Sequence, residues 1–305
     1  MHHAGQTPCA LCWAFRIIVV DSLSDQNPLI KQIRRAVSRG TLTEDGYAIA
    51  EGTHLLEEAI AAKCEIRAVI VAESAQARLA MLLAEAARGA SAKPGLSPSP
   101  VPAEAAYSRE RTTRSARTQA SRAALPEARV VTDKTFRDLS STNTPQGVIT
   151  LVRPPEWPAA RMLGPSALVI VLDGLQDPGN AGAILRAAEA FGASGVVFLK
   201  GTVNPYNPKC LRGSAGSVFR VPIATELNLA GLAVYAAMPR AAKAVSEADF
   251  RVPCAIVIGS ESHGVHPEMA AGATGVRIET AGVESLNAAV AAGIFLYEAR
   301  RQRTP

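Results

Sequence analysis

Three loops in the C-terminal half of the 305-residue chain carry polar residues and glycines at spacings that suit ligand chemistry. The first loop follows an apolar run and contains Asn180, Gly182 and Arg186. We expect Asn180 to cap the helix that carries Arg186. On that helix Arg186 lies about 200° from the apolar Ile184, which leaves its guanidinium free to reach a ligand. The alternative is an ion pair with Glu189, three residues later.

The second loop contains Gly259, Glu261 and Gly264 and follows another apolar run. Glycine lets a backbone approach a ligand closely or adopt a positive φ. Glu261 then lies at the edge of a sheet; alternatively, it is only an acid at a helix start, where the helix dipole favours it. His263 and His266 are interpreted as surface residues.

The third loop, Ser285-Leu286-Asn287, precedes an almost wholly apolar helix. Either Ser285 or Asn287 is expected to cap that helix through its side-chain oxygen. Alanine and glycine predominate over residues 288–293, so the helix can pack very closely against a neighbour. It is therefore either part of the core or an interface.

Several common catalytic signatures are absent from the sequence. Without GxGxxG or GxxxxGK[ST], familiar nucleotide-binding folds are disfavoured, and without GxSxG or HExxH, serine hydrolases and zinc enzymes are too. A lone Cys9/Cys12 pair beside His2 and His3 lacks the second pair that a zinc site would need. We therefore expect no metal.

Four short apolar runs position the loops, at residues 167–172, 195–199, 233–237 and 255–258. They alternate with helical stretches, a pattern typical of a parallel sheet covered by helices on both faces. Ligands bind such sheets at the carboxyl ends of the strands, where the first two loops begin.

The N-terminal half is predicted to be a smaller α/β unit. Its first helix begins at Asn27-Pro28 and ends at Gly40. Lys31, Arg35 and Arg39 share one face of this helix, where they either meet phosphate or are only solvated. Further strands are expected at 47–50, 67–71, 130–131 and 147–152, with helices over 53–62 and up to about residue 88.

Hydrophobic residues make up 48% of the chain and charged residues 19%, which allows a sizeable core. No apolar run approaches the ~20 residues of a membrane span, and five cysteines are too few for a disulfide framework. Residues 88–129 hold eight basic and three acidic residues, an excess equal to the net charge of +5. This segment is predicted to be a flexible basic insert that either meets a polyanion or is merely solvated.

These patterns predict four parts of the chain, with prolines 154, 155 and 158 marking a linker. The parts are a disordered leader over 1–22, an N-terminal domain over 23–153 with a disordered basic insert at about 90–126, a linker over 154–165, and a C-terminal α/β domain over 166–305.

In this order and spacing, the three loops resemble the signature motifs of the SpoU (TrmH-type) RNA ribose methyltransferases of the SPOUT class. Asn180, Gly182 and Arg186 match N-x-G-x-x-x-R; the second loop matches G-x-E-x-x-G; and the third is S-L-N. The segment from Arg212 to Pro222 is similar to the family's R-x-S-x-G-x-x-F-x-x-P, and Ala50-Glu51-Gly52 is similar to its companion RNA substrate-binding domain.

The resemblance implies a deep trefoil knot that binds S-adenosylmethionine, homodimerisation through the knot, and 2′-O-methylation of a ribose. It assigns catalytic roles to Arg186, Asn180, Glu261, Ser285 and Asn287. The cofactor contacts that it implies are Gly259, Gly264, Ile278, Leu286, Ser285 and Asn287. RNA contacts are expected at Lys31, Arg35, Arg39 and Arg212.

The expected substrate is 23S ribosomal RNA, in the cytoplasm. The alternatives are a tRNA ribose methyltransferase and a non-catalytic RNA-binding or ribosome assembly protein. The sequence departs from the family where Ile278-Glu279-Thr280 replaces the usual Ile-Pro-Met beside the expected cofactor pocket. Asn287 is also followed by Ala-Ala instead of the common Val-Ser.

Overall fold

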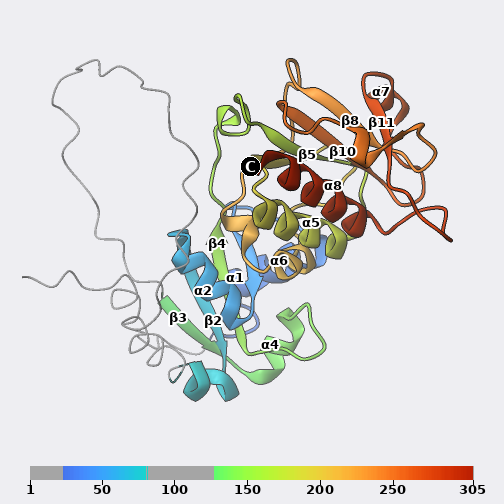
Figure 1. The fold of residues 1–305 in the computed structure, drawn as a ribbon. Coiled ribbons are helices and arrows are strands. Elements are labelled where there is room, and N and C mark those ends of the chain that lie inside the picture. The colour runs from blue at the N-terminus through green and yellow to red at the C-terminus, as the bar shows by residue number, and fades with distance from the viewer. Residues whose placement is uncertain (1–22, 80, 82–126, 305) are drawn as a thin grey trace, which may run out of the picture.

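A computed structural model describes residues 23–79, 81 and 127–304. The predicted leader and basic insert lie outside the described residues. The described chain forms two sheets, one from each half of the sequence (Figure 1). None of its helices is long and apolar enough to cross a membrane.

The N-terminal sheet has four strands in the order β1-β4-β2-β3. β4 pairs antiparallel with both β1 and β2, whereas β2 and β3 are parallel. The elements of this half are α1 (Pro28–Arg39), β1 (Ala48–Glu51), α2 (Thr53–Ala61), β2 (Glu65–Ala72), a 3₁₀ turn (Glu73–Ala75), β3 (Glu127–Val131), α4 (Asp133–Leu139) and β4 (Val148–Arg153).

Helix α1 begins and ends where the sequence predicts. The side chain of Asn27 accepts a hydrogen bond from the backbone N–H of Leu29, at 2.9 Å, and Gly40 ends the helix with a left-handed φ of 62°. Lys31, Arg35 and Arg39 are exposed, as expected of a basic face. Arg35 pairs with Glu44, at 3.2 Å.

The C-terminal sheet has seven strands in the order β7-β6-β5-β10-β8-β11-β9, and each of its pairings is parallel. This confirms the predicted parallel sheet. The strands are β5 (Leu168–Asp173), β6 (Gly195–Phe198), β7 (Ile223–Ala224), β8 (Ala233–Ala237), β9 (Lys243–Ala244), β10 (Cys254–Gly259) and β11 (Thr274–Arg277). The helices are α5 (Pro178–Phe191), α6 (Pro208–Ser214), α7 (Pro267–Ala271) and α8 (Ala288–Arg303), with 3₁₀ turns at Ala159–Arg161, Ser217–Phe219 and Val245–Glu247.

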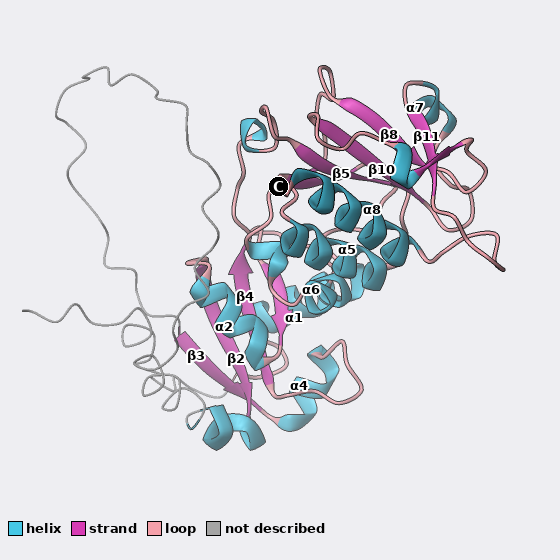
Figure 2. Ribbon diagram, in the orientation of Figure 1, coloured by secondary structure: helices cyan, strands magenta, loops and turns pink. Residues whose placement is uncertain are grey.

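Helices cover only one face of this sheet fully (Figure 2). Leu168, Ile170 and Leu172 of β5 belong to the same core cluster as side chains of α5, α6 and α8. The alternate residues Val169 and Val171 lie in another cluster, which loops and the short α7 cover. The expectation of helices on both faces is therefore wrong, because the segment between β7 and β8 is a loop.

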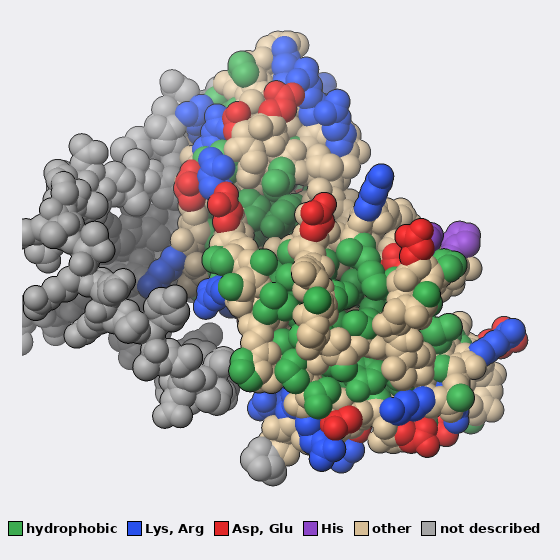
Figure 3. Space-filling view, turned by 90° about the horizontal axis from the view of Figure 1, so that it is seen from above, with side chains coloured by type: hydrophobic (Ala, Val, Ile, Leu, Met, Phe, Trp, Pro, Cys, Tyr) green, Lys and Arg blue, Asp and Glu red, His purple; other side chains and the backbone are tan. Residues whose placement is uncertain are grey.

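Seen from above, hydrophobic side chains gather in the middle of the surface and Lys and Arg lie towards its rim (Figure 3).

One buried cluster spans the two halves, and the N-terminal half has a second cluster of its own. Ala48, Ala50, Leu55 and Ala59 of the N-terminal half belong to the same buried cluster as Leu211 of α6 and its neighbours in the C-terminal half. The segment predicted as a linker also packs against the fold, since Met162 is fully buried in the second cluster of the large sheet.

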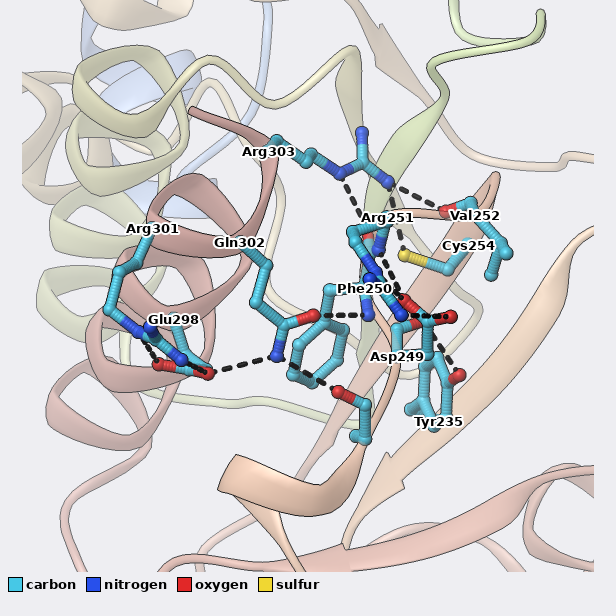
Figure 4. A network of polar contacts seen from close by, with 11 residues as sticks. Tyr235, Asp249, Phe250, Arg251, Val252, Cys254, Glu298, Arg301, Gln302 and Arg303 are labelled. Carbon is cyan, nitrogen blue, oxygen red and sulfur yellow. Dashed lines mark hydrogen bonds and ion pairs between the residues drawn. The ribbon is translucent and has the colours of Figure 1, made fainter. Parts of the chain in front are cut away.

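The end of α8 is fastened to the start of the sheet (Figure 4). The Arg303 guanidinium donates to four backbone carbonyls, those of Ser166, Ala167, Phe250 and Val252, at 2.6 to 2.9 Å. These carbonyls flank the first residues of β5 and β10. One arginine thereby fixes α8 against the edge of the sheet opposite the loops that carry the three sequence motifs.

Candidate active site

The helix that carries the first motif is capped by Asp177, not by Asn180. Oδ1 of Asp177 accepts a hydrogen bond from the backbone N–H of Asn180, at 2.7 Å, and Pro178 occupies the first helical position. The prediction that Asn180 is the cap is therefore wrong. Its side chain lies inside the first turn and is free to make other contacts.

Asn180 joins the other two motifs through its side-chain amide. Its Nδ2 donates to Oε1 of Glu261, at 2.6 Å, and its Oδ1 accepts from Nδ2 of Asn287, at 3.0 Å. The Oδ1 of Asn287 in turn caps α8 by accepting from the backbone N–H groups of Ala289 and Val290. One chain of hydrogen bonds therefore connects the three loops that the sequence singles out.

Glu261 lies in the turn after β10 and not at a helix start, so the alternative explanation for this residue is wrong. The side chains of Glu261, Asn180 and Asn287 meet near the carboxyl ends of β5 and β10, which are adjacent in the sheet. His263 and His266 are exposed, as predicted. The backbone N–H of His266 donates to Oδ2 of Asp173, at 2.7 Å, which ties this loop to the end of β5.

Arg186 is exposed and makes no hydrogen bond or ion pair within the described chain. Its alternative partner, Glu189, is held by Arg220, whose Nη2 lies 3.0 Å from Oε2 of that carboxylate. Because Arg220 already binds Glu189, the ion pair that spacing favoured does not form. The Arg186 guanidinium is thus available to a ligand.

A cavity of about 770 Å³ opens between the second and third loops. Glu261 lines it, together with residues of the loop after β8, such as Met238 and Arg240. Asn180 and Arg186 are not among the lining residues. All six residues expected at the cofactor line it, namely Gly259, Gly264, Ile278, Ser285, Leu286 and Asn287.

The second loop forms one wall of the cavity, and its tight turn requires glycine at positions 259 and 264. Ser260 and Gly264 exchange two backbone hydrogen bonds, at 2.9 and 3.0 Å, so the chain doubles back on itself. A Cβ at Gly259 would lie 2.1 Å from the carbonyl carbon of Gly264, and Gly264 itself has a φ of 69°. The two glycines therefore allow a tight turn at the edge of the cavity.

The departure from the family pattern lies in a turn at the cavity rim. The Thr280 hydroxyl donates to the backbone carbonyl of Val283, at 2.7 Å, and Thr280 lines the cavity. Glu279 is exposed and lies 3.6 Å from Arg277. The hydrogen bond from the Thr280 side chain thus closes the turn between residues 280 and 283. Ser285 and Leu286 follow it, and Ser285 is exposed.

Arg212 is not a free surface arginine. Its Nη1 lies 2.5 Å from the Ser141 hydroxyl and 3.6 Å from Oε2 of the buried Glu51, and both partners belong to the N-terminal half. In the sequence, Glu51 stands out only as part of a family-like tripeptide, and no motif singles out Asp177, Ser141 or Arg220. The Asp-Pro pair before Asn180 was the one local signal that could have indicated Asp177 as the cap.

Hydrogen bonding lowers the pKa of two of these acids. Burial raises the pKa of Glu51, but the donors in its cradle, Ser140, Ser141 and Thr142, more than offset this and leave it below its usual range. The Asn180 N–H, and then Lys209, lower the pKa of Asp177. Both carboxyls are therefore charged at neutral pH. Among the described residues, no group of three or more His, Cys, Asp or Glu side chains could hold a metal ion.

Residues 167–297 match the model of the SpoU rRNA Methylase family. Among curated proteins, the chain is 32% identical over 293 residues to an uncharacterized tRNA/rRNA methyltransferase of Synechocystis, an alignment that covers 92% of this chain and 93% of that protein. It is 37% identical over 148 residues to the 23S rRNA (guanosine-2′-O-)-methyltransferase RlmB of Xanthomonas axonopodis, covering 45% of this chain and 59% of RlmB.

Among solved structures, an AdoMet-bound rRNA methyltransferase from Sinorhizobium meliloti superposes with a TM-score of 0.68 at 26% identity. That match covers 94% of this chain and 99% of the other. The likeness therefore extends over both sheets and is not confined to the segment that carries the three motifs.

Proposed function

Because the chain belongs to the SpoU rRNA methylase family, we propose that it transfers a methyl group from S-adenosylmethionine to the 2′-hydroxyl of a ribose in ribosomal RNA. The observation that carries this proposal is the hydrogen-bonded chain from Asn287 through Asn180 to Glu261. It joins the three motif loops at the mouth of a cavity large enough for a cofactor. The enzyme needs no metal for this chemistry.

The cavity suits S-adenosylmethionine in both size and lining. The apolar Ile278 and Leu286 offer surfaces for the adenine, and the loop around Gly259 offers backbone groups for the polar parts of the cofactor. Asn287 fixes the start of α8 beside them. When bound, the cofactor supplies a methyl group activated by a sulfonium.

Arg186 is proposed to stabilise the negative charge on the 2′-oxygen that would develop as the hydroxyl proton passes to solvent. The oxygen would then take the methyl group from the sulfonium, which leaves a neutral thioether. A guanidinium has a pKa above ~12, so it is a poor proton acceptor but a good donor to an oxyanion. Asn180 and Glu261 would orient the ribose, because their side chains are held by each other and by Asn287. Ser285 and Asn287 would hold the third loop against the cofactor.

RNA is proposed to approach from the N-terminal half. Lys31, Arg35 and Arg39 are exposed along one face of α1, and Arg212 lies where α6 meets the N-terminal sheet. The names of RlmB and of RlmP from Bacillus subtilis favour 23S rRNA among possible substrates. The tRNA/rRNA designation of the Synechocystis relative keeps tRNA as the second candidate.

Four features that the resemblance implies remain proposals. They are a knot in the C-terminal sheet, a homodimer formed through it, a cytoplasmic location, and a division into an RNA-binding domain over 23–153 and a methyltransferase domain over 166–305. The exposed Val290 and Tyr297 of α8 support the homodimer, because they offer apolar surface beside α5.

The test is methyl transfer by the purified chain with radiolabelled S-adenosylmethionine, offered 23S rRNA and bulk tRNA separately. We expect label in 23S rRNA, at a site that ribose-methylation mapping locates to a 2′-oxygen. Label in tRNA alone would favour the second candidate. Cofactor binding with no transfer to either RNA would contradict the proposed activity, and RNA binding without cofactor binding would indicate a non-catalytic RNA-binding or assembly protein.

A further inference from the structure

Two acid–arginine pairs cross the junction between the halves of the molecule. α6 packs against both α5 and β1, and the 3₁₀ turn Ser217–Phe219 follows it. Arg212 at the end of α6 reaches Glu51 of β1, and Arg220 just after the turn reaches Glu58 of α2. The two pairs join neighbouring segments of the two halves, yet the surroundings of their arginines differ.

Glu51 lies in a cradle of donors. Its side chain is only 4% exposed. Oε1 accepts from the hydroxyls of Ser140 and Thr142, and Oε2 accepts from the backbone N–H and the hydroxyl of Ser141, at 2.9 and 2.7 Å. A buried carboxylate is costly unless it is hydrogen-bonded and paired. This cradle therefore keeps a negative charge at a fixed position next to Arg212.

The Ser141 hydroxyl bridges Glu51 and Arg212, so the fixed carboxylate also fixes the guanidinium. It donates to Glu51 and accepts from Nη1 of Arg212, at 2.5 Å, while the Ser141 carbonyl lies 3.5 Å from Nη2. Nε of Arg212 has no acceptor among the described residues, and the side chain is 29% exposed. One edge of the guanidinium is held, and the Nε edge is left for a ligand.

Arg220 shows the opposite arrangement. Its Nη1 donates to Glu58, and its Nε and Nη2 donate to the two carboxylate oxygens of Glu189. Two carboxylates thus occupy all three nitrogens of this guanidinium. Because every nitrogen of Arg220 already donates to a carboxylate, both of its edges are occupied and its pair serves to hold the two halves together.

We propose that Glu51, acting through Ser141, is a positioning residue that aims the free edge of Arg212 at a backbone phosphate of the RNA substrate. A guanidinium with one edge held and the other free is suited to bidentate binding of phosphate. α6 packs directly on the helix that carries Asn180 and Arg186: a Cβ at Gly182 would lie 2.5 Å from the Cys210 carbonyl. A phosphate held by Arg212 would therefore help to place the reacting ribose. This inference rests on the proposed function.

The test compares Glu51→Gln, Ser141→Ala and Arg212→Gln in the full chain, with Glu58→Gln as the matched control from the other pair. Single-turnover methyl transfer is measured at saturating 23S rRNA, beside calorimetry with S-adenosylmethionine and thermal unfolding. We expect about tenfold slower transfer for Glu51→Gln and Arg212→Gln, because small misplacements of a bound substrate slow its reaction strongly. Their double variant should be no slower than Arg212→Gln, and cofactor affinity should not change.

The charges discriminate positioning from simple electrostatics. Glu51→Gln removes a negative charge, so electrostatics alone predicts tighter RNA binding and an unchanged rate, a result that would overturn the proposal. Ser141→Ala leaves every charge in place, and slower transfer by this variant supports positioning. The proposal would also be overturned if Glu51→Gln and Arg212→Gln lowered the melting temperature without changing the rate of methyl transfer. Equal slowing of methyl transfer by the control Glu58→Gln would overturn it as well.

The proposal can fail separately from the proposed function. If the wild-type chain methylates no RNA, the readout is the slope of log Kd for bulk rRNA against log salt. Loss of one phosphate contact flattens such a slope by roughly 0.7–0.9. We expect this flattening for Arg212→Gln and for Ser141→Ala. Unchanged slopes would overturn the role of Arg212 and Glu51 even if RNA binds.

Discussion

Asn180 has the orientation of its amide fixed from both sides. Its Nδ2 faces the Glu261 carboxylate and its Oδ1 faces the Nδ2 of Asn287, so a flipped amide would place oxygen against oxygen and nitrogen against nitrogen. The direction of the whole chain of hydrogen bonds is therefore set. Beside it, Arg186 is the one motif side chain that is charged, exposed and without a partner in the described residues.

We expect Arg186→Lys to be nearly as inactive as Arg186→Ala. Lysine keeps the charge but lacks the planar fork that could hold the 2′-oxygen and a phosphate together. kcat should fall by roughly 10²–10³, the scale for removing one oxyanion donor, with cofactor affinity unchanged. Single-turnover transfer and calorimetry measure the two effects. Near-normal activity of the lysine variant would show that charge alone suffices.

Gly259→Ala should abolish binding of S-adenosylmethionine. The new Cβ would lie 2.1 Å from backbone atoms of Gly264, so the turn that lines the cavity would have to open. Gly272→Ala is the matched control, because its φ is −94° and nothing lies within 4 Å of its Cβ position. Calorimetry should detect cofactor heat for the control and none for Gly259→Ala. Equal binding by both would mean that the loop is not part of the cofactor site.

At the scale of single elements, the start of α5 decides where the first motif points. Asp177 caps this helix and pairs with Lys209, at 3.2 Å, so the following turn presents Asn180 to the other two loops. We expect Asp177→Ala to destabilise the protein by about 1 kcal/mol, the usual cost of losing a cap, and Asp177→Asn to cost less. Urea unfolding at neutral pH measures both.

The charge of Asp177 gives the same element a pH dependence. Folding lowers the pKa of this carboxyl from its ordinary 3.8, mainly through the Asn180 N–H. A carboxyl with a lowered pKa stabilises the fold above its unfolded pKa, and this contribution disappears as the pH falls through the folded value. The difference in unfolding free energy between wild type and Asp177→Asn should therefore shrink below about pH 4. A difference independent of pH would exclude a role for the charge.

Local signals explain which elements the sequence predicts. The residues next to α1 and α8 mark where these helices begin or end. Asn27 caps the start of α1 and Gly40 ends it, and Asn287 caps the start of α8. β7 and β9 are two residues long and β11 reads Thr-Gly-Val-Arg, so they carry no apolar run to detect. Tertiary pairing alone makes them strands.

Long-range contacts explain what the sequence does not predict about the site. The motif order placed Asn180 and Glu261 at one sheet edge, because both follow strands of a parallel sheet. No periodicity relates Arg212 to the hydroxyls around Glu51, or Glu189 to Arg220 rather than to Arg186. The Arg212 contacts form only after the halves have packed together, and the Glu189–Arg220 pair forms only after α5 has packed against the 3₁₀ turn that follows α6.

For the whole molecule, the decisive feature is that the halves share a core instead of being joined by a free tether. A fragment from Ser166 onwards should bind S-adenosylmethionine, because all residues that line the cavity lie between 237 and 295. It should also melt at a lower temperature than the full chain, because it loses the cover of Ala48, Ala50 and Leu55 and the acidic partners that Arg212 and Arg220 have in the N-terminal half. Calorimetry and thermal unfolding measure the two effects. A folded fragment without cofactor heat would contradict the proposed division of labour.

The shared core has a consequence for how strongly an RNA is held. Two contact surfaces on a flexible tether act at an effective concentration that the tether dilutes, whereas surfaces on one rigid body have their spacing set in advance. The basic face of α1 and the pocket beside Asn180 lie on such a body. An RNA whose own shape matches that spacing contacts both surfaces at once with little further loss of conformational entropy. A strand that must be bent to fit contacts only one of the two surfaces. We therefore expect the protein to discriminate between RNAs by the distance between their two contact points.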